Sequence, residues 1–285
     1  MLGFRFFPGW SLKDECSKFF PVMPGRQTET MGPLWVMLVF IFLLGCCVGS
    51  FLNVCIYRLP QDLSIVSPRS FCPSCRAPIR AYDNIPLVSY LLLGGKCRHC
   101  GAGISWRYPL VEALAGGVAL ALFLKFGFSF SFLAYFVLAA ALIVISFIDL
   151  DHRIIPDLIS LPGIGVGFLL ALFGPLATVK ESLIGLLAGG GSLYLVAFVY
   201  EALNKREGMG GGDVKLLAMI GAWLGWKAIV FTLFFASLSG SFIGGAVMLI
   251  QKEGRLYAIP FGPFLAFSGL AYVFFGPALI HWYLN

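Results

Sequence analysis

Long apolar runs fill most of this 285-residue sequence, and they restrict the folds open to it. A run of about 18 or more apolar residues with few charges is long enough to cross a bilayer as a helix. We interpret eight runs as spans, at about 33–56, 109–126, 128–150, 158–174, 182–203, 214–226, 228–250 and 260–283. The run at 214–226 is short for a full crossing. The sequence therefore predicts an all-α polytopic membrane protein with about eight transmembrane helices.

The overall composition agrees with a membrane protein. Hydrophobic residues make up 59% of the chain and charged residues only 12%, whereas soluble domains carry about 25% charged residues. The mean hydropathy is +0.89. A net charge of +6 alone could indicate a nucleic-acid partner. In a membrane protein, however, basic residues first report topology, so we expect membrane lipid and no nucleic acid around this chain.

The apolar pattern divides the chain into four parts: a tail at 1–32, a first transmembrane helix at 33–56, a polar segment at 57–108 and a membrane core at 109–285. Basic residues concentrate on the side of the polar segment. The loops that eight spans place opposite hold only Lys125, Lys180 and Lys227. Because Lys and Arg accumulate on the cytoplasmic side, we expect the polar segment to be cytoplasmic and both termini to lie outside. The basic residues on the predicted cytoplasmic side are Arg58, Arg69, Arg76, Arg80, Lys96, Arg98, Arg107, Arg153, Lys205, Arg206, Lys252 and Arg255.

The tail opposes this orientation, because it carries Arg5, Lys13, Lys18 and Arg26. Two interpretations stay open. Met31 could be the natural start, which would make the first 30 residues non-native. Alternatively, the tail could lie on the membrane surface.

Two Cys-x-x-Cys pairs stand in the polar segment, "CPSC" at 72–75 and "CRHC" at 97–100. Four thiolates from two such pairs meet the needs of a closed structural zinc site. A redox pair and unliganded cysteines are the alternatives, but a reducing cytoplasm disfavours disulfides. We therefore predict that Cys72, Cys75, Cys97 and Cys100 bind zinc, with no open position for catalysis. Outside the pairs, Cys46, Cys47 and Cys55 are expected to be packing residues.

Carboxylates at the borders of apolar runs are the candidate catalytic groups, because charges in membrane spans are costly and usually functional. Asp149 ends the run "AALIVISFI", and Asp213 follows the glycines 210–212. Nearby, Asp151 and Asp157 are more easily read as polar helix borders, with Asp157 at the cap or first turn of the next span.

The predicted topology puts Asp149 and Asp213 at similar depth on the same side of the membrane. Two such carboxylates can share a proton, so that one activates water and the other polarises a carbonyl. Gly210, Gly211 and Gly212 would let a helix or an extended substrate backbone approach Asp213, or let the backbone unwind there. On these residues alone, a proton-coupled transporter fits as well.

Glycines four residues apart also occur inside two spans, as Gly185 with Gly189 and Gly240 with Gly244. Such pairs allow helices to approach closely in lipid. For each pair, the alternative interpretation is equally good: glycine is tolerated in membrane helices without any role in helix approach.

The sequence resembles the prepilin leader peptidases, the bifunctional membrane aspartyl proteases of type IV pilus and type II secretion systems. "GGGD" at 210–213 matches the Gly-x-Gly-Asp motif of that family, and "FIDLDHRIIPD" at 147–157 resembles the stretch with its other catalytic aspartate. The order of these motifs and the two cysteine pairs is specific, and the likeness runs from about Met31 to the C-terminus. Further similar stretches lie at 49–60, 82–100, 104–112 and 259–266.

This resemblance implies catalytic roles for Asp149 and Asp213 and a place in the bacterial inner membrane, with the active site facing the cytoplasm. It implies cleavage of prepilins and pseudopilins after a glycine, then methylation of the new N-terminal amine, usually of phenylalanine, by S-adenosylmethionine. A peptidase that has lost methylation is the alternative. The methylation candidates are Asp83, Asn84, Arg107 and Glu112, although a turn at 83–84 and an Arg107–Glu112 salt bridge would explain them structurally.

Overall fold

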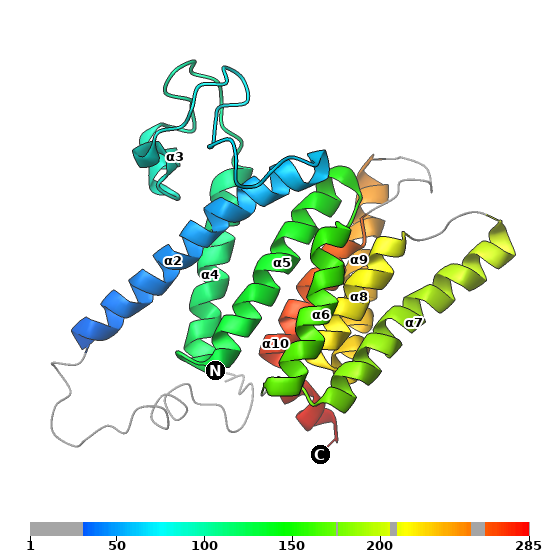
Figure 1. Cartoon of the computed structure of the whole chain (residues 1–285). Helices are drawn as coiled ribbons and strands as arrows, with labels where there is room; N and C mark the ends of the chain where they lie inside the picture. Colours follow the sequence, from blue (N-terminus) through cyan, green and yellow to red (C-terminus); the bar gives the residue numbers. More distant parts are fainter. Residues whose placement is uncertain (1–30, 175, 206–209, 252–259, 285) are drawn as a thin grey trace, which may run out of the picture. The chain divides into compact units, whose positions relative to one another are not determined.

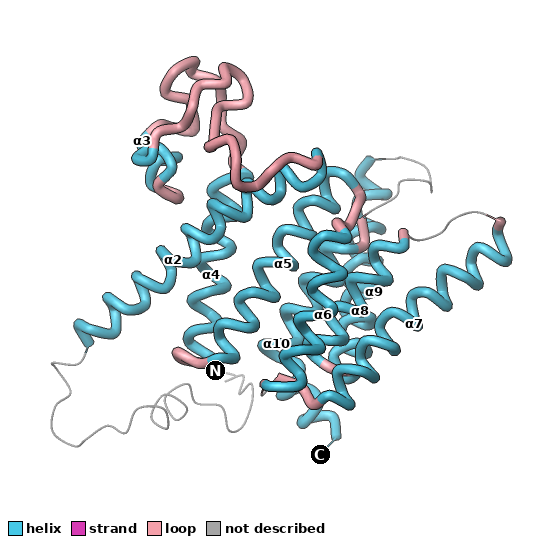
Figure 2. The backbone as a smooth tube through the Cα atoms, in the orientation of Figure 1, coloured by secondary structure: helices cyan, strands magenta, loops and turns pink. Residues whose placement is uncertain are grey.

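The computed structural model describes residues 31–174, 176–205, 210–251 and 260–284, and they form a helical protein (Figure 1). Within these residues there is no β-strand, only two isolated β-bridges, and Figure 2 shows helix throughout the membrane part. Two 3₁₀ turns, η1 (Leu59–Gln61) and η2 (Ala81–Asn84), lie in the polar segment. The α-helices are α2 (Met31–Arg58), α3 (Val88–Leu92), α4 (Arg107–Phe126), α5 (Phe130–His152), α6 (Asp157–Phe173), α7 (Val179–Asn204), α8 (Gly211–Leu224), α9 (Trp226–Gln251) and α10 (Gly262–Leu284).

Six of the described helices are long and apolar enough to cross a membrane: α2, α4, α5, α7, α9 and α10. The other two predicted spans are shorter helices, α6 with 17 residues and α8 with 14. The prediction of an all-α polytopic membrane protein with about eight membrane helices is thus confirmed. The predicted tail at 1–30 lies outside the described residues.

The start of α7 differs from its prediction at 182, because the helix begins at Val179. Thr178 forms a reciprocal cap with Glu181: its hydroxyl accepts the Glu181 backbone N–H at 3.2 Å, and the Glu181 carboxylate accepts the Thr178 N–H at 3.1 Å. Such a capping box satisfies backbone donors at a helix start. The polar residues that form it also interrupt the apolar pattern, which is why hydropathy alone placed the start too late.

Helix α8 lies at the centre of the bundle and packs against α6, α7, α9 and α10. Its residues 216–223 are all buried, as expected of a helix that is apolar on every side. A Cβ built on Gly185 of α7 would lie 2.3 Å from the Gly221 carbonyl oxygen of α8, and one on Gly189 would lie 2.6 Å from that of Leu217. The predicted close approach of helices at Gly185 and Gly189 is thus confirmed. At Gly240 the nearest neighbour of an added Cβ is at 3.7 Å, an ordinary van der Waals contact.

Consecutive membrane helices run in alternating directions, so chain order decides which ends lie together. The end of α5 and the starts of α8 and α10 are on the side of the bundle that carries the cysteine segment (Figure 1). Helices α6 and α10 each pack against both α5 and α8. The carboxyl end of α5 is thereby held near the amino end of α8.

By its internal contacts the chain divides after Phe40, and residues 31–40 are the first part of α2. From Ile41 onward, α2 packs closely on α4: a Cβ on Gly45 would lie 2.7 Å from Ala119 Cβ, and one on Gly49 would lie 2.7 Å from Glu112 Cα. A buried cluster then joins α2, α4 and α5. The division into a tail, first helix, polar segment and core at 109–285 stays a prediction.

Candidate active site and metal centre

Asp149 lies in the last turn of α5, and its side chain is buried. Its Oδ2 accepts a 3.0 Å hydrogen bond from the backbone N–H of Gly262, at the first residue of α10. Helix α5 ends at His152. The next residue, Arg153, takes a left-handed conformation and donates its N–H to the Asp149 carbonyl oxygen at 2.9 Å. Asp149 is therefore fixed through both its backbone and its side chain.

Asp213 is the third residue of α8 and lies close enough to Asp149 for the two carboxylates to interact electrostatically. Its Oδ1 is buried and has no hydrogen-bond partner among the described residues. Ile155 packs beside the pair: a Cβ on Gly212 would lie 2.8 Å from Ile155 Cβ, and one on Gly262 would lie 3.3 Å from Ile155 Cδ1. The structure thus brings together the two acids that the sequence singled out.

The three glycines before Asp213 differ in their surroundings. Gly210 is the extended residue that caps α8, while Gly211 and Gly212 are already helical. Gly212 allows the approach of Ile155. Among the described residues, an added Cβ on Gly211 has no neighbour within 4 Å, and one on Gly210 has only a backbone atom at 4.0 Å. The backbone approach at Gly212 is therefore made by the chain's own Ile155, and no side chain of the described residues crowds Gly210 or Gly211.

Asp151 and Asp157, expected at polar helix borders, both form ion pairs away from the Asp149–Asp213 pair. Asp157 is the first residue of α6 and pairs with Lys215 at 2.7 Å. Asp151 pairs with Arg107, at the start of α4. The sequence-based alternative of an Arg107–Glu112 salt bridge is therefore wrong, because the Arg107 guanidinium turns toward α5.

Arg107 holds the end of α5 on both sides of Asp149. Besides its ion pair with Asp151, it donates a hydrogen bond of 3.2 Å to the Phe147 carbonyl oxygen. Its guanidinium carbon also lies 5.1 Å from the centre of the Phe147 ring. Sequence reasoning missed this contact, because the partners are some 40 residues apart and nothing local joins them.

Gly262 is the other functional residue that sequence reasoning did not single out. It lies in the stretch 259–266, which carried only a resemblance. Its contribution is a backbone N–H and a missing side chain, and neither leaves a recognisable pattern in a sequence.

The four cysteines of the polar segment form one cluster with all sulfur atoms within 4.8 Å of one another. The Sγ atoms of Cys72 and Cys100 lie 3.9 Å apart, and those of Cys75 and Cys97 lie 4.0 Å apart. Tetrahedral zinc with bonds of about 2.3 Å would separate sulfurs by about 3.8 Å, so the cluster fits such an ion. The backbone N–H of Cys75 lowers the pKa of Cys72 to about 6, which favours the thiolate that metals bind.

The two cysteine pairs sit in turns of the same construction. Arg76 donates its N–H to the Cys72 carbonyl oxygen at 2.8 Å, and Gly101 donates to that of Cys97 at 2.9 Å. Both donors are in the left-handed region, with φ of 57° at Arg76 and 71° at Gly101. An isolated antiparallel bridge closes each turn. The repeated geometry presents each pair of thiols toward the other pair.

The remaining described cysteines lie in α2. Cys46 and Cys55 are buried, as expected of packing residues, but Cys47 is exposed. The packing prediction is therefore wrong for Cys47, which falls on the outer face of the helix.

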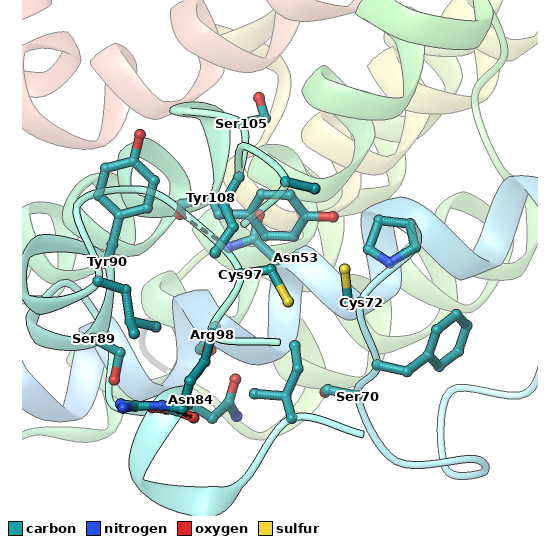
Figure 3. Close-up of a pocket in the computed structure, with 18 of the residues that line it drawn as sticks. Asn53, Ser70, Cys72, Asn84, Ser89, Tyr90, Cys97, Arg98, Ser105 and Tyr108 are labelled. Carbon is teal, nitrogen blue, oxygen red and sulfur yellow. Dashed lines mark hydrogen bonds and ion pairs between the residues drawn. The ribbon is translucent and has the colours of Figure 1, made fainter. Parts of the chain in front are cut away.

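A cavity of about 410 Å³ lies between α2, α4 and the cysteine segment. Figure 3 shows part of its lining, with Asn53 of α2 donating to the Tyr108 carbonyl oxygen at 3.0 Å. Three of the four methylation candidates line it: Asp83, Asn84 and Glu112. Arg107 does not, since it faces α5.

The candidates on the cavity are held in different ways. Asp83 and Asn84 belong to η2, so the expected turn is present. Arg98 forms a 2.6 Å ion pair with Asp83 and lowers the pKa of that carboxyl below its usual value. Glu112 Oε2 instead accepts the Leu87 backbone N–H at 2.8 Å.

Two family models match parts of this chain. The family model described as the bacterial peptidase A24 N-terminal domain matches residues 43–126, and that of the type IV leader peptidase family matches residues 136–245. No solved structure matches the chain.

Curated relatives named prepilin leader peptidase/N-methyltransferase match nearly the whole length. The protein from Aeromonas hydrophila is 38% identical over 88% of this chain and 95% of its own. The protein from Pseudomonas aeruginosa is 38% identical over 92% of this chain and 98% of its own. The protein from Myxococcus xanthus is 43% identical over 79% of this chain and 66% of its own. This chain belongs to the type IV leader peptidase family.

Proposed function

We propose that this protein cleaves the basic leader from type IV prepilins and pseudopilins after a glycine, and then methylates the new N-terminal amine. The names of its relatives carry both activities. The two functions fall on different parts of the chain: we assign cleavage to the membrane core at 109–285 and methylation to the segment at 57–108.

The observation that carries the cleavage proposal is the meeting of Asp149 and Asp213 at one end of the bundle. A pair of carboxylates catalyses peptide hydrolysis when one is ionised and the other holds a proton. The Gly262 N–H stabilises negative charge on Asp149, so we assign the ionised role to this residue. Asp149 then takes a proton from the attacking water, while protonated Asp213 polarises the scissile carbonyl and gives its proton to the leaving amine.

The absence of crowding side chains at Gly210 and Gly211, among the described residues, suits an extended substrate. A helical prepilin must unwind to offer its peptide bond to the dyad. Glycine unwinds at little cost because it has low helix propensity, and its missing side chain suits a site adjoining a glycine-rich helix start. This accounts for a preference for glycine before the cut.

Location and orientation follow from the distribution of basic residues. We place the protein in the bacterial inner membrane, with the cysteine segment and the dyad facing the cytoplasm, because Lys and Arg concentrate in that segment. Leaders of prepilins are basic and remain on the same side, so the dyad would meet them there.

We assign zinc to the four-cysteine cluster. Sulfur is the ligand atom that zinc takes in closed structural sites, and the Sγ separations fit it. The ion would hold together a segment that has little core of its own. S-adenosylmethionine is the methyl donor that the relatives' activity requires, and the cavity beside the cluster is within the size range of small-molecule sites, about 300–1,000 Å³.

The test is to co-express the protein with a prepilin and measure the intact mass of the pilin. We expect loss of the leader and gain of one methyl group. Asp149→Ala and Asp213→Ala should each leave the prepilin uncut, while Asp157→Asn, at the same end of the bundle, should cleave normally. Cleavage by either dyad variant would overturn the catalytic assignment, and cleavage without methylation would leave a peptidase alone.

A further inference from the structure

Glu112 is a buried carboxylate at the wall of the cavity between α2, α4 and the cysteine segment. We infer that this cavity is the methyl-transfer site and that Glu112 is the group that binds the new N-terminal ammonium and takes its proton. The inference rests on the methylation half of the proposed function, and it names a catalytic residue for it.

Glu112 is held firmly in position. Its Oε2 accepts the Leu87 backbone N–H at 2.8 Å, and the Ser50 side chain lies beside its carboxylate. Helix α2 packs directly against it, since a Cβ on Gly49 would lie 2.7 Å from Glu112 Cα. Leu87 has a positive φ of 61°, and this unusual conformation directs its N–H to the carboxylate. A group fixed by three segments is preorganised to receive a ligand.

No cation balances the charge of Glu112 among the described residues. Of the two arginines that line the main cavity, Arg58 donates to the Ser64 and Pro68 carbonyl oxygens and Arg98 pairs with Asp83. Arg107, at the start of α4, pairs with Asp151. Buried carboxylates are normally paired, because an isolated buried charge is costly. A cationic ligand in the cavity would supply the missing partner, and the substrate of N-methylation is an ammonium group.

The surroundings of Glu112 suit a reaction between two ligands. A second hollow of about 390 Å³ shares Ser50 with the main cavity and extends along α2 past Cys47 and Phe51. The methyl donor needs one compartment and the end of the pilin helix needs another, and their reacting atoms must meet. Ser50 lines both hollows, and its side chain lies beside the Glu112 carboxylate. The other residues common to both linings are Val54, Arg58, Ser70 and Asn84.

The apolar part of the lining suits the residue that carries the amine. Val54, Phe71, Ile85, Tyr90 and Ile104 all border the main cavity. An aromatic side chain at the N-terminus of the pilin would lie against such surfaces, while its ammonium reaches the carboxylate. A peptide with a blocked, neutral N-terminus would lose the contact with the Glu112 carboxylate and keep the contact of its aromatic side chain with the apolar surfaces.

The chemical step requires removal of one proton before the methyl group moves. An α-ammonium has a pKa near 8, and in this form its nitrogen has no free electron pair. The Glu112 carboxylate accepts the proton, which leaves a neutral amine. The nitrogen pair then forms a bond to the methyl carbon as the carbon–sulfur bond of the sulfonium donor breaks, and that electron pair remains on sulfur.

Glu112→Gln tests this role, because it keeps the shape and a carbonyl acceptor for the Leu87 N–H but removes the charge. In co-expression with a prepilin, we expect it to cut the leader as the wild type does and to add no methyl group. Glu201→Gln, an exposed position on α7, is the matched control and should methylate fully. Full methylation by Glu112→Gln would overturn the inference.

A binding measurement gives a readout that does not depend on turnover. We would titrate the purified enzyme, in detergent, with a short pilin peptide that begins with phenylalanine, and with its N-acetylated form. The wild type should prefer the free amine by about tenfold, as for a hydrogen bond to a charged group, and Glu112→Gln should show no preference. Equal preference in both proteins would overturn the inference.

These outcomes separate the two levels of the proposal. If the wild type cuts prepilin but never methylates it, the methylation half of the proposed function fails, and this inference fails with it. If the wild type and Glu112→Gln both methylate, only this inference fails. Should Glu112→Gln not accumulate, Ser50→Ala decides: it leaves the charge but removes the hydroxyl contact, and an unchanged methylated fraction would count against the site.

Discussion

The backbone N–H of Gly262 donates a 3.0 Å hydrogen bond to Oδ2 of Asp149, across 113 residues of sequence. The contact joins the first residue of α10 to the last turn of α5. It places a donor with no side chain against a buried carboxylate, in a space that leaves no room for a methyl group. Preorganised backbone donors of this kind stabilise charge without having to reorient during a reaction.

Gly262→Ala should therefore abolish most of the cleavage. The new Cβ would lie 2.6 Å from Asp149 Oδ2, so either the carboxylate or α10 must move. Misplacement of a catalytic group by an ångström can cost about 100-fold in rate, and we expect a loss of that order in the initial rate on purified prepilin. Gly117→Ala, where an added Cβ meets nothing within 4 Å, should retain the wild-type rate. A Gly262→Ala enzyme with normal cleavage would remove the positioning role of this glycine.

Arg107→Ala should lower cleavage modestly, because it releases the end of α5 on both sides of Asp149. The Arg107 and Asp151 side chains are 26% and 40% exposed, and exposed pairs contribute about 0.2–1 kcal/mol. The expected loss is thus at most about fivefold, and Asp151→Ala should give a similar loss. In a double-mutant cycle, the two effects should not add. If Arg107→Ala cleaves normally but does not methylate, the result would instead support a role for Arg107 in methylation.

Cys97→Ser should remove the metal and methylation while sparing cleavage. Three thiolates bind zinc less tightly than four, and the segment that the ion stabilises forms one wall of the cavity. Zinc content can be measured by mass spectrometry of the purified protein, beside the cleaved and methylated fractions of a prepilin. Cys47→Ser, at an exposed position of α2 outside the cluster, is the control for zinc content. Unchanged zinc in Cys97→Ser would contradict the ligand assignment.

Gly185→Ala should destabilise the bundle by about 1–3 kcal/mol, the range for overpacking a core. Its Cβ would lie 2.3 Å from the Gly221 carbonyl oxygen, so α7 and α8 would have to separate. The midpoint of thermal unfolding in detergent measures the effect. Gly191 lies in the same helix, and an added Cβ there meets nothing within 4 Å. The Gly191→Ala variant should therefore unfold at the wild-type midpoint. Equal midpoints for the two variants would show that the helices can part without cost.

Several features were open to prediction from local sequence. Apolar runs predicted the ends of the membrane helices to within three residues, and the largest differences are at the starts of α7 and α8. The spacing of the cysteines predicted a cluster, and its sulfurs do meet. The candidates Asp83, Asn84 and Glu112 came from the family resemblance, and they gather on one cavity. Arg107 was assigned to the wrong partner, because an arginine side chain reaches in many directions and sequence shows none of them.

The sequence by itself determined that this chain is a helical membrane protein with a four-cysteine segment and two acids at the same end of the bundle. Hydrophobic length, thiol spacing and alternating helix direction are local or additive properties, so they can be read along the chain. Only the tertiary structure decided that Gly262 holds Asp149 and that Arg107 holds the helix on either side of it. It also decided that Glu112 lies in a cavity where none of the described residues offers it a cation. Those relationships depend on how α2, α4, α5, α8 and α10 pack against one another, and packing joins residues that are far apart in sequence.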